Sequence, residues 1–258
     1  MKRRPISLVV MSCTTLALTA CAGREGAAVG DCSPGITDTE VHIGSSLPLS
    51  GAGAAYGAIA VATKAYFDEI NESGGVKMAD GKTRKIKLTT LDDAYDPART
   101  VANAHTLVQK DKVAAMMNVL GTSPNLAISD YIAGVKIPNL FAMTGTDGFG
   151  SQGGERQWMQ AWLPQYAFEA QVLGEHVIEK KPDGKVGILF QNDGFGKAML
   201  ANFKKVFDGT GVKIVSEQSY EQTGGSVDSQ MVNLAKSGAD VFLDYATGTF
   251  MTQSLKKK

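Results

Sequence analysis

Short apolar runs alternate with longer amphipathic segments through the first part of this chain. A nearly continuous apolar run is typical of a strand that is buried on both faces of a parallel sheet. Apolar residues at helical spacing between these runs predict helices. Strands are expected at residues 41–47, 85–92, 113–120 and 135–143, and helices at 58–71, 97–110 and from 124 onward. This alternation predicts a doubly wound α/β fold with a parallel sheet.

The same alternation begins again after Pro164, which we take as the boundary between two similar lobes. A strand at 158–163 precedes the boundary, and the second lobe has only about three strands, fewer than a typical sheet. We therefore expect a first lobe at 38–163 and an incomplete second lobe at 164–258, which stops where a further helix should begin. The expected elements after Pro164 are helices at 167–180, 196–208 and 228–237 and strands at 185–190, 213–220 and 241–245.

The N-terminal residues 1–21 have the layout of an export signal, with a basic start, an apolar stretch and small residues at the end. The sequence Leu-Thr-Ala-Cys that ends at Cys21 resembles the bacterial lipobox, in which this cysteine is acylated and becomes the new N-terminus. An ordinary signal peptide cleaved near Ala22 is the alternative. Residues 22–37 are rich in Gly, Ala and Ser and are expected to form a flexible tether. We predict an exported, lipid-anchored protein in the periplasm or at the cell surface.

Composition argues against nucleic-acid binding and a disulfide. The 258 residues carry a formal net charge of zero and are 43% hydrophobic and 20% charged, so no basic excess indicates nucleic-acid binding. A disulfide is not expected, because Cys13 lies in the signal, Cys21 would carry lipid and Cys32 has no partner.

Metal binding and catalysis have no support in the sequence. His42, His105 and His176 lie on three separate predicted elements without ligand spacing, so we expect no metal site. No C-x-x-C, H-E-x-x-H or G-x-S-x-G motif occurs, so nucleophilic catalysis is not indicated and no cofactor is expected.

Glycines 51, 53 and 57 lie between a predicted strand and a predicted helix, as in a dinucleotide-binding turn. Their spacing is one residue too long, and a lone glycine pattern is a weak signal. Nucleotide binding is therefore kept only as an alternative.

Hydroxyl groups gather where two neighbouring strands are predicted to end. Thr122 and Ser123 follow the strand at 113–120, and Thr144-Gly145-Thr146 follows the strand at 135–143. Ser123 is predicted to cap a helix that has Pro124 at its first position. The carboxyl edge of an open α/β sheet is where ligands bind, and a helix N-terminus there suits an anion such as a carboxylate. Tyr56 and Phe195 lie in turns at other strand ends, where they could cover a ligand or simply pack locally.

Five dispersed motifs resemble the solute-binding proteins of branched-chain amino acid ABC transporters, the leucine-binding family. The resemblance covers residues 37 to 258 in order. The motifs are V-H-I-G-S-S-L-P-L-S-G from Val41, F-D-E-I-N-E-S-G-G from Phe67, D-D-A-Y-D-P from Asp92, the turn at Thr122-Ser123, and D-G-F-G from Asp193.

The resemblance implies the type I periplasmic-binding-protein fold, in which two Rossmann-like lobes close on a solute through a hinge. It also implies that the chain should continue past Lys258, so we expect a C-terminal truncation. In that family the turns that match 120–123 and 144–146 hold the ligand carboxylate through hydroxyls and main-chain N–H groups. The expected ligand-binding residues are Tyr56, Leu120, Thr122, Ser123, Thr144, Gly145, Thr146, Asp193 and Phe195.

The chain also departs from the family pattern. The position of Phe195 is usually a tyrosine, and Tyr95 and Gly121 occupy the places of a disulfide found in some relatives. The acid that receives the ligand amino group has no clear match in residues 163–169, and the other family acid would lie beyond Lys258. An amide, a short carboxylate or an aromatic acid fits these residues about as well as an amino acid.

The favoured function is an extracytoplasmic receptor that delivers a small polar solute to an ABC permease and its ATPase subunits. An exported enzyme or nucleotide-binding protein on the same fold is the second hypothesis, and an extracellular ligand sensor is the third. The export signal and the lack of a catalytic constellation favour the first.

Overall fold

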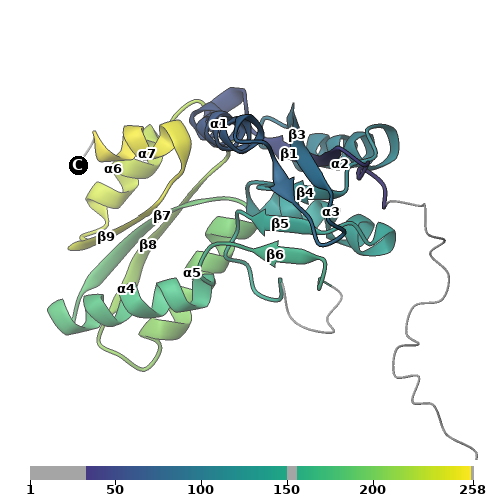
Figure 1. The fold of residues 1–258 in the computed structure, drawn as a ribbon. Helices are drawn as coiled ribbons and strands as arrows, with labels where there is room; N and C mark the ends of the chain where they lie inside the picture. Colours follow the sequence, from purple (N-terminus) through teal and green to yellow (C-terminus); the bar gives the residue numbers. More distant parts are fainter. Residues whose placement is uncertain (1–32, 150–155, 257–258) are drawn as a thin grey trace, which may run out of the picture. The chain divides into compact units, whose positions relative to one another are not determined.

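A computed structural model describes residues 33–149 and 156–256 of the chain. The predicted signal peptide, Cys21, Cys32 and most of the predicted tether lie outside these ranges. The described residues form two sheets with helices packed on them (Figure 1). Apart from one short edge strand, both sheets are built from parallel strands joined by helices, so the predicted α/β fold is confirmed.

Six strands form the first sheet in the order β2-β3-β1-β4-β5-β6. All neighbours are parallel except β2, a two-residue edge strand that pairs antiparallel with β3 and was not predicted. The chain moves from β1 to β3 on one side and then returns to β4 on the other, so the strand order reverses between β1 and β4. Such a reversal opens a crevice at the carboxyl ends of the strands. The strands are β1 Glu40–Leu47, β2 Val76–Lys77, β3 Thr83–Asp92, β4 Ala115–Met117, β5 Asn139–Ala142 and β6 Met159–Ala161.

Right-handed crossovers decide which helices cover which face of this sheet. Because β1 to β3 and β3 to β4 run in opposite directions across the sheet, α1 (Ala58–Glu72) lies opposite α2 (Pro97–His105) and α3 (Thr122–Val135). Asp96 caps α2 by accepting a hydrogen bond from the Ala98 N–H, as the Asp-Pro sequence predicts. A short 3-10 helix, Gly51–Gly57, connects β1 to α1, and a π-helical turn, Thr106–Lys110, extends α2.

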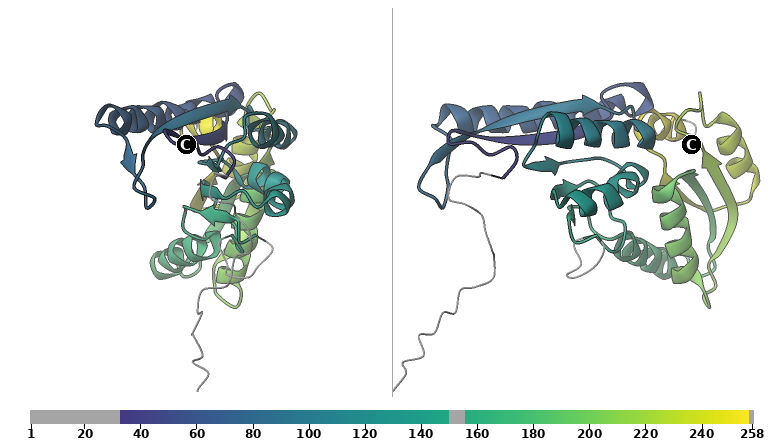
Figure 2. Two further views of the ribbon diagram at one scale, coloured as in Figure 1. Left: turned by 45° about the vertical axis from the view of Figure 1, so that its right-hand side comes forward. Right: turned by 90° about the vertical axis from the view of Figure 1, so that its right-hand side faces the viewer.

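Three parallel strands form the second sheet in the order β8-β7-β9. Alternate residues of the central strand β7 face different helix layers: Ile188 packs in the core with Phe203, and Leu189 packs in the core with Phe250. Figures 1 and 2 show α4 and α5 side by side on one face, where they contact each other. The elements are α4 Tyr166–Lys180, β7 Lys185–Gln191, α5 Gly194–Phe207, β8 Lys213–Tyr220, α6 Asp228–Lys236, β9 Val241–Tyr245 and α7 Gly248–Leu255. The prediction that the chain ends before a helix is wrong, since α7 follows β9 directly.

The start of α3 corrects a second prediction. Helix α3 begins at Thr122 with Gly121 as its N-cap residue, so Ser123 is not the cap and Pro124 is third rather than first in the helix. Gly121 has φ of 100°, a value that favours glycine, and a Cβ there would lie 2.6 Å from the Tyr95 ring. Proline is still accommodated, because the first N–H groups of a helix have no intrahelical acceptor.

Two predicted strands are shorter than expected. The strand at 113–120 is reduced to β4, because Asn118 adopts a left-handed φ of 58° that interrupts the extended backbone. The strand at 135–143 begins only at Asn139, because α3 continues to Val135 and Lys136 then takes a left-handed conformation with φ of 55°. Both strands still end beside one another, so the predicted neighbouring strand ends are confirmed.

Candidate ligand-binding site

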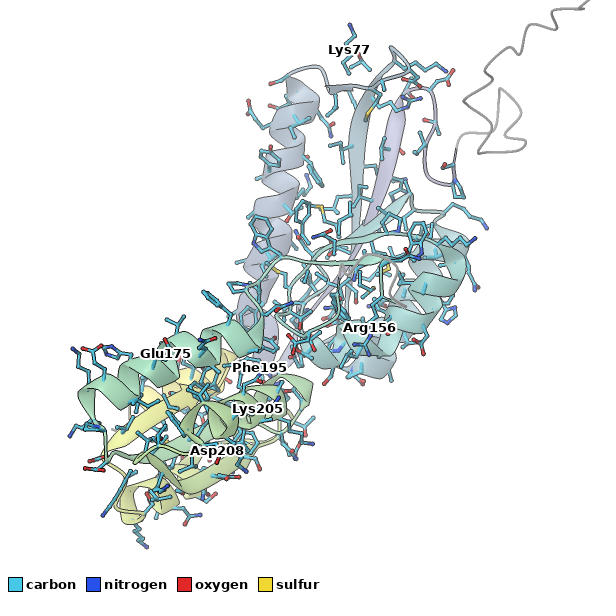
Figure 3. The ribbon with its side chains drawn as sticks, turned by 90° about the horizontal axis from the view of Figure 1, so that it is seen from below. Lys77, Arg156, Glu175, Phe195, Lys205 and Asp208 are labelled. Atoms are coloured by element: carbon cyan, nitrogen blue, oxygen red, sulfur yellow. The ribbon has the colours of Figure 1, made fainter. Side chains whose placement is uncertain are left out.

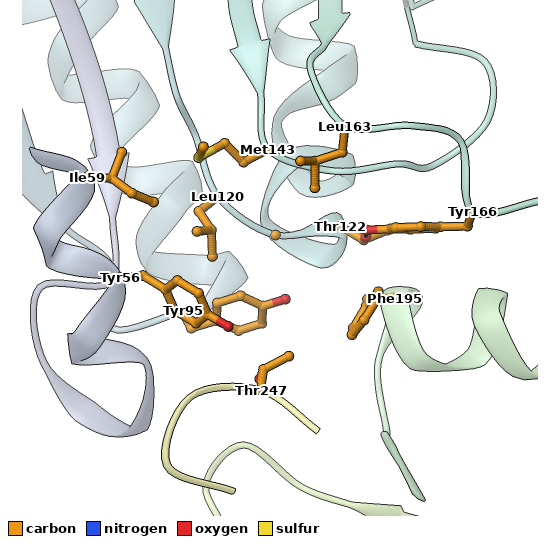
Figure 4. Close-up of a pocket in the computed structure, with 11 residues that line it drawn as sticks. Tyr56, Ile59, Tyr95, Leu120, Thr122, Met143, Leu163, Tyr166, Phe195 and Thr247 are labelled. Atoms are coloured by element: carbon orange, nitrogen blue, oxygen red, sulfur yellow. The ribbon is translucent and has the colours of Figure 1, made fainter. Parts of the chain in front are cut away.

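A cavity of about 260 Å³ lies beside the carboxyl ends of β4 and β5 (Figure 4). Its walls are mainly aromatic and aliphatic, and each lobe contributes residues from turns and helix starts. Such a concave, mostly apolar site with few polar groups is typical of small-molecule binding. The lining residues are Tyr56, Ile59, Tyr95, Leu120, Gly121, Thr122, Met143, Leu163, Tyr166, Phe195 and Thr247.

Three buried hydroxyl groups form a triangle at one wall of the cavity. The Thr122 hydroxyl lies 2.9 Å from that of Thr144 and 2.9 Å from that of Tyr166, and the Thr144 and Tyr166 hydroxyls are 3.3 Å apart. Thr122 is 1% exposed and Thr144 is fully buried. The Thr144 oxygen also accepts a hydrogen bond from the Thr146 N–H at 3.1 Å. The triangle therefore holds the Thr122 side chain in one position at the cavity wall.

The N-terminus of α3 lies at the same wall. Gly121 supplies no side-chain cap, and the N–H groups of Thr122 and Ser123 belong to the first turn, where no intrahelical acceptor exists. Both N–H groups lie at the positive end of the helix dipole. This wall therefore suits a negatively charged or hydrogen-bond-accepting group.

Ser123 is turned toward the second lobe instead of capping its own helix. Its hydroxyl oxygen accepts a hydrogen bond from the Gly194 N–H at 3.1 Å, at the start of α5. The carboxylate of Asp193 caps the same helix by accepting from the N–H groups of Phe195 at 2.9 Å and Gly196 at 3.1 Å. Side chains of both lobes therefore accept hydrogen bonds from the N–H groups in the first turn of α5.

Asp193 also connects the two sheets. Its second oxygen accepts hydrogen bonds from the Gln191 amide at 2.7 Å and from the Tyr95 hydroxyl at 3.2 Å. Burial and the nearby Asp193 charge raise the pKa of Tyr95 well above its ordinary value, so this tyrosine remains a proton donor.

The second lobe fixes Thr247 through a network around Gln191. The Gln191 side-chain oxygen accepts from Tyr220 at 3.1 Å, from Gln222 at 2.6 Å and from Thr247 at 2.6 Å. Burial raises the pKa of Tyr220 to about 12, so its hydroxyl keeps its proton at neutral pH. Thr247 is thus held at the cavity by Gln191 of β7, Tyr220 of β8 and Gln222 in the turn after β8.

The structure places the predicted site residues in two groups. Four of them line the cavity: Tyr56, Leu120, Thr122 and Phe195. The other five lie outside its lining, although most contact residues that form it. These five are Ser123, Thr144, Gly145, Thr146 and Asp193. Gly145 lies behind the wall, where a Cβ would approach the Pro164 carbonyl oxygen to 2.2 Å.

Sequence reasoning missed several lining residues, above all Tyr95 and Tyr166. Tyr95 adopts a left-handed φ of 64° that turns its ring onto Gly121. The positions that the resemblance gives to a disulfide are therefore adjacent here, and a ring packs where the bridge would be. Tyr166 is the first residue of α4, and nothing in its local sequence distinguishes it from a core aromatic. Figure 3 shows Phe195 between the two lobes, while Glu175 and Lys205 are exposed on α4 and α5.

Within residues 33–149 and 156–256, no group of three or more His, Cys, Asp or Glu residues could hold a metal ion. Over the same residues, no helix combines the length and the apolar character needed to cross a membrane.

The family model described as periplasmic binding protein matches residues 40–257. The chain belongs to this family. A periplasmic binding protein of this type is a solute receptor. The two lobes with parallel sheets, and the cavity that residues of both lobes line, agree with that role.

Two relatives and one solved structure illustrate the similarity. An amino acid binding protein of Pseudomonas aeruginosa is 24% identical over 226 residues, covering 78% of this chain and 52% of the relative. A Leu/Ile/Val-binding protein homolog of Brucella suis is 26% identical over 216 residues, covering 79% of this chain and 51% of the relative. A fatty acid ABC transporter substrate-binding protein from Thermomonospora curvata superposes with a TM-score of 0.69 at 23% identity. The superposition covers 83% of this chain and 53% of the other.

The resemblance to the leucine-binding proteins is thus confirmed. The chain spans about half the length of the curated relatives that it matches.

Proposed function

We propose that this periplasmic binding protein captures a small solute that carries a carboxylate or amide and delivers it to an ABC importer. The solute is a branched-chain amino acid or a related acid or amide. The lipid-anchored receptor works outside the cytoplasmic membrane, and its partners are a permease with its ATPase subunits. It performs no chemistry on the solute.

One observation carries the proposal. The uncapped first turn of α3 and the Thr122 hydroxyl meet an apolar cavity, and together they match an acceptor group attached to an apolar body. The similarity to an amino acid binding protein of Pseudomonas aeruginosa supports this choice, since an apolar amino acid carries a carboxylate on an apolar body. A hydrogen bond to a charged group contributes about 1.5–3 kcal/mol, enough to orient a small ligand.

The proposed lobe boundary near Pro164 fits the two sheets, because the first ends with β6 and the second begins with β7. Closure of lobes 38–163 and 164–258 around the solute would bring Phe195 against the Tyr56 side of the cavity. Tyr56 and Phe195 already line the same cavity.

A ligand screen on the full-length protein tests the receptor function. A solute that binds only the folded state at 100 times its Kd adds about 2.7 kcal/mol of stability and raises the melting temperature. The panel contains amino acids, their deaminated acids and their amides. A protein whose melting temperature responds to none of them does not have the proposed function. Ligand-dependent stimulation of the ATPase activity of the reconstituted permease complex then tests delivery.

Acylation of Cys21 is tested separately, because this residue lies outside the described ranges. A Cys21→Ser protein should be exported and released from the membrane fraction. A variant that remains fully membrane-bound after export would contradict the lipid anchor.

A further inference from the structure

We infer that Asp93 is a positioning residue of the ligand site, because it holds Tyr95 in the conformation that places its ring in the wall of the cavity. Asp93 directly follows the last residue of β3 and is fully buried. Tyr95 lines the cavity and Asp93 does not, so Asp93 would affect a solute only through Tyr95. The inference rests on the proposed receptor function, which assigns this wall to solute binding.

The backbone that carries Tyr95 is in a conformation that needs support. Ala94 and Tyr95 have φ of 50° and 64°, so two consecutive residues with side chains lie in the left-handed region. Only glycine enters this region without a steric cost. Such backbone persists where surrounding contacts enforce it, and it is frequent at ligand sites. One of these contacts is the hydrogen bond from the Ala94 N–H to the Asp92 carboxylate at 2.9 Å.

The Asp93 carboxylate supplies the contact at Tyr95 itself. One of its oxygens accepts a hydrogen bond from the Tyr95 N–H at 2.9 Å. Its other oxygen accepts from the hydroxyls of Ser46 at 2.7 Å and Thr100 at 3.2 Å. Ser46 belongs to β1 and Thr100 to α2, so the group that receives the Tyr95 N–H is anchored to two separate elements.

This turn directs the Tyr95 ring to the starts of two helices. The ring lines the cavity (Figure 4) and lies so close to Gly121 that a Cβ there would be 2.6 Å from a ring carbon. Its hydroxyl donates a hydrogen bond to Asp193 at 3.2 Å. The ring therefore connects the uncapped start of α3 with the capped start of α5. A change in the backbone of Tyr95 would disturb both contacts.

Stability alone does not favour a carboxyl group at position 93. Burial raises the pKa of Asp93, although hydrogen bonds from Ser46, from the Tyr95 N–H and from Thr100 act in the opposite direction. A charged group is costly to bury. A buried N–H without an acceptor is also costly, and the Asp93 oxygen is the acceptor of the Tyr95 N–H. The contact that the acid makes possible is thus the one that fixes the cavity wall.

Fluorine NMR on the full-length protein without ligand tests the positioning role. 3-Fluorotyrosine is placed at Tyr95 in one sample and at Tyr56 in another. Both rings line the cavity, but Tyr56 lies on the turn after β1. We expect Asp93→Ala to shift and broaden the Tyr95 signal and to leave the Tyr56 signal unchanged. An unchanged Tyr95 signal would overturn the inference.

Two variants separate positioning from a general loss of stability. Asp93→Asn keeps an acceptor oxygen for the Tyr95 N–H and should retain the wild-type signal. Thr100→Val removes a hydroxyl from the other carboxylate oxygen and should also leave the Tyr95 signal in place. A shift in Thr100→Val as large as in Asp93→Ala would overturn the inference. If Asp93→Ala does not fold, Asp93→Ser replaces it, because a serine hydroxyl holds such an N–H only weakly. It should shift the same signal.

Calorimetry then tests the effect on binding with L-leucine, 4-methylpentanoate and L-leucinamide as probes. Asp93→Ala should weaken the tightest-binding probe about tenfold, and Thr100→Val by less than about twofold. In a Tyr95→Ala background, Asp93→Ala should cost no further affinity, because both changes act on the same wall. A further tenfold loss there would overturn the inference. If wild type binds none of the probes, the receptor function fails for this class of solute, and the fluorine signals still decide whether Asp93 positions Tyr95.

Discussion

Helices α3 and α5 both begin just after an interior strand of their sheet, but their first turns are used in opposite ways. The first turn of α5 is closed by side chains: Asp193 accepts from two of its N–H groups, and Ser123 accepts from a third. The first turn of α3 has Gly121 as its N-cap residue and no side-chain cap. The same local geometry is therefore capped by side chains in one lobe and has no side-chain cap in the other, where we propose that a ligand binds.

This difference suggests that the two lobes would contact different parts of a bound solute. In the first lobe, Thr122 lies at the uncapped start of α3 and is held by hydrogen bonds to Thr144 and to Tyr166 of the second lobe. The second lobe presents the Phe195 ring, which contacts the rings of Tyr166 and Tyr245 at centroid distances of 5.3 Å and 6.0 Å. The first lobe would orient the solute, and the second would cover its apolar body.

Removing the cap of α5 should have the largest effect. Asp193→Ala leaves two N–H groups uncapped and deprives Tyr95 and Gln191 of their acceptor, so we expect a loss of about 3 kcal/mol in the free energy of unfolding. Urea denaturation measures this loss. Asp193→Asn keeps one acceptor oxygen and should lose less than half as much. A loss below about 1 kcal/mol in Asp193→Ala would show that α5 does not depend on this cap.

Changing the ligand-facing wall of α3 should reduce affinity more than stability. Thr122→Ala removes a hydroxyl beside the uncapped turn, and we expect binding of the identified solute to weaken about 10- to 100-fold. Thr122→Ser keeps the hydroxyl and is the control. Thr146 is also predicted to bind the ligand, although it lies outside the cavity lining. Calorimetry on Thr146→Ala tests that prediction. Affinity in Thr122→Ala within a factor of two of wild type would mean that the carboxylate is not bound at this wall.

Ser123→Ala should destabilise the helix of the other lobe rather than its own. The Gly194 N–H loses its acceptor, and the expected cost is about 1 kcal/mol. Amide hydrogen exchange should become faster at the start of α5 and stay unchanged at the start of α3. Faster exchange at the start of α3 with no change at the start of α5 would instead identify Ser123 as the cap of α3.

The smallest expected effect concerns acid stability of the loop that carries Tyr56. Partial burial raises the pKa of Asp92, but hydrogen bonds from Ser50 and from the main chain of Ala94 and Leu49 outweigh it and lower the pKa to about 2. A carboxyl group whose pKa is lowered by folding stabilises the fold at pH values above its pKa in the unfolded chain, which is near 4. This stabilisation is lost as the pH falls toward about 2. Wild type should therefore be more stable than Asp92→Asn at pH 5, with the difference shrinking by pH 2. Urea titrations at both pH values measure it, and a constant difference would contradict the assignment.

The sequence by itself determined the order and type of nearly all elements and several local details. Asp96 stands directly before Pro97, and its side chain caps α2 as the sequence predicts. The hydroxyls at the ends of neighbouring strands also follow from pattern, because parallel strands end at one edge of a sheet. Such contacts span a few residues, so local sequence contains all the partners that decide them.

Only the tertiary structure decided where individual side chains act. The hydroxyl of Ser123 could cap its own helix or another one, and the choice depends on Gly194, which lies 71 residues further along the chain. Tyr95 and Tyr166 became cavity walls because the packing of Gly121 and the hydroxyl triangle orients their rings. A side chain with several available partners takes the one that folding brings within hydrogen-bonding distance, and that distance is set by the packing of both sheets.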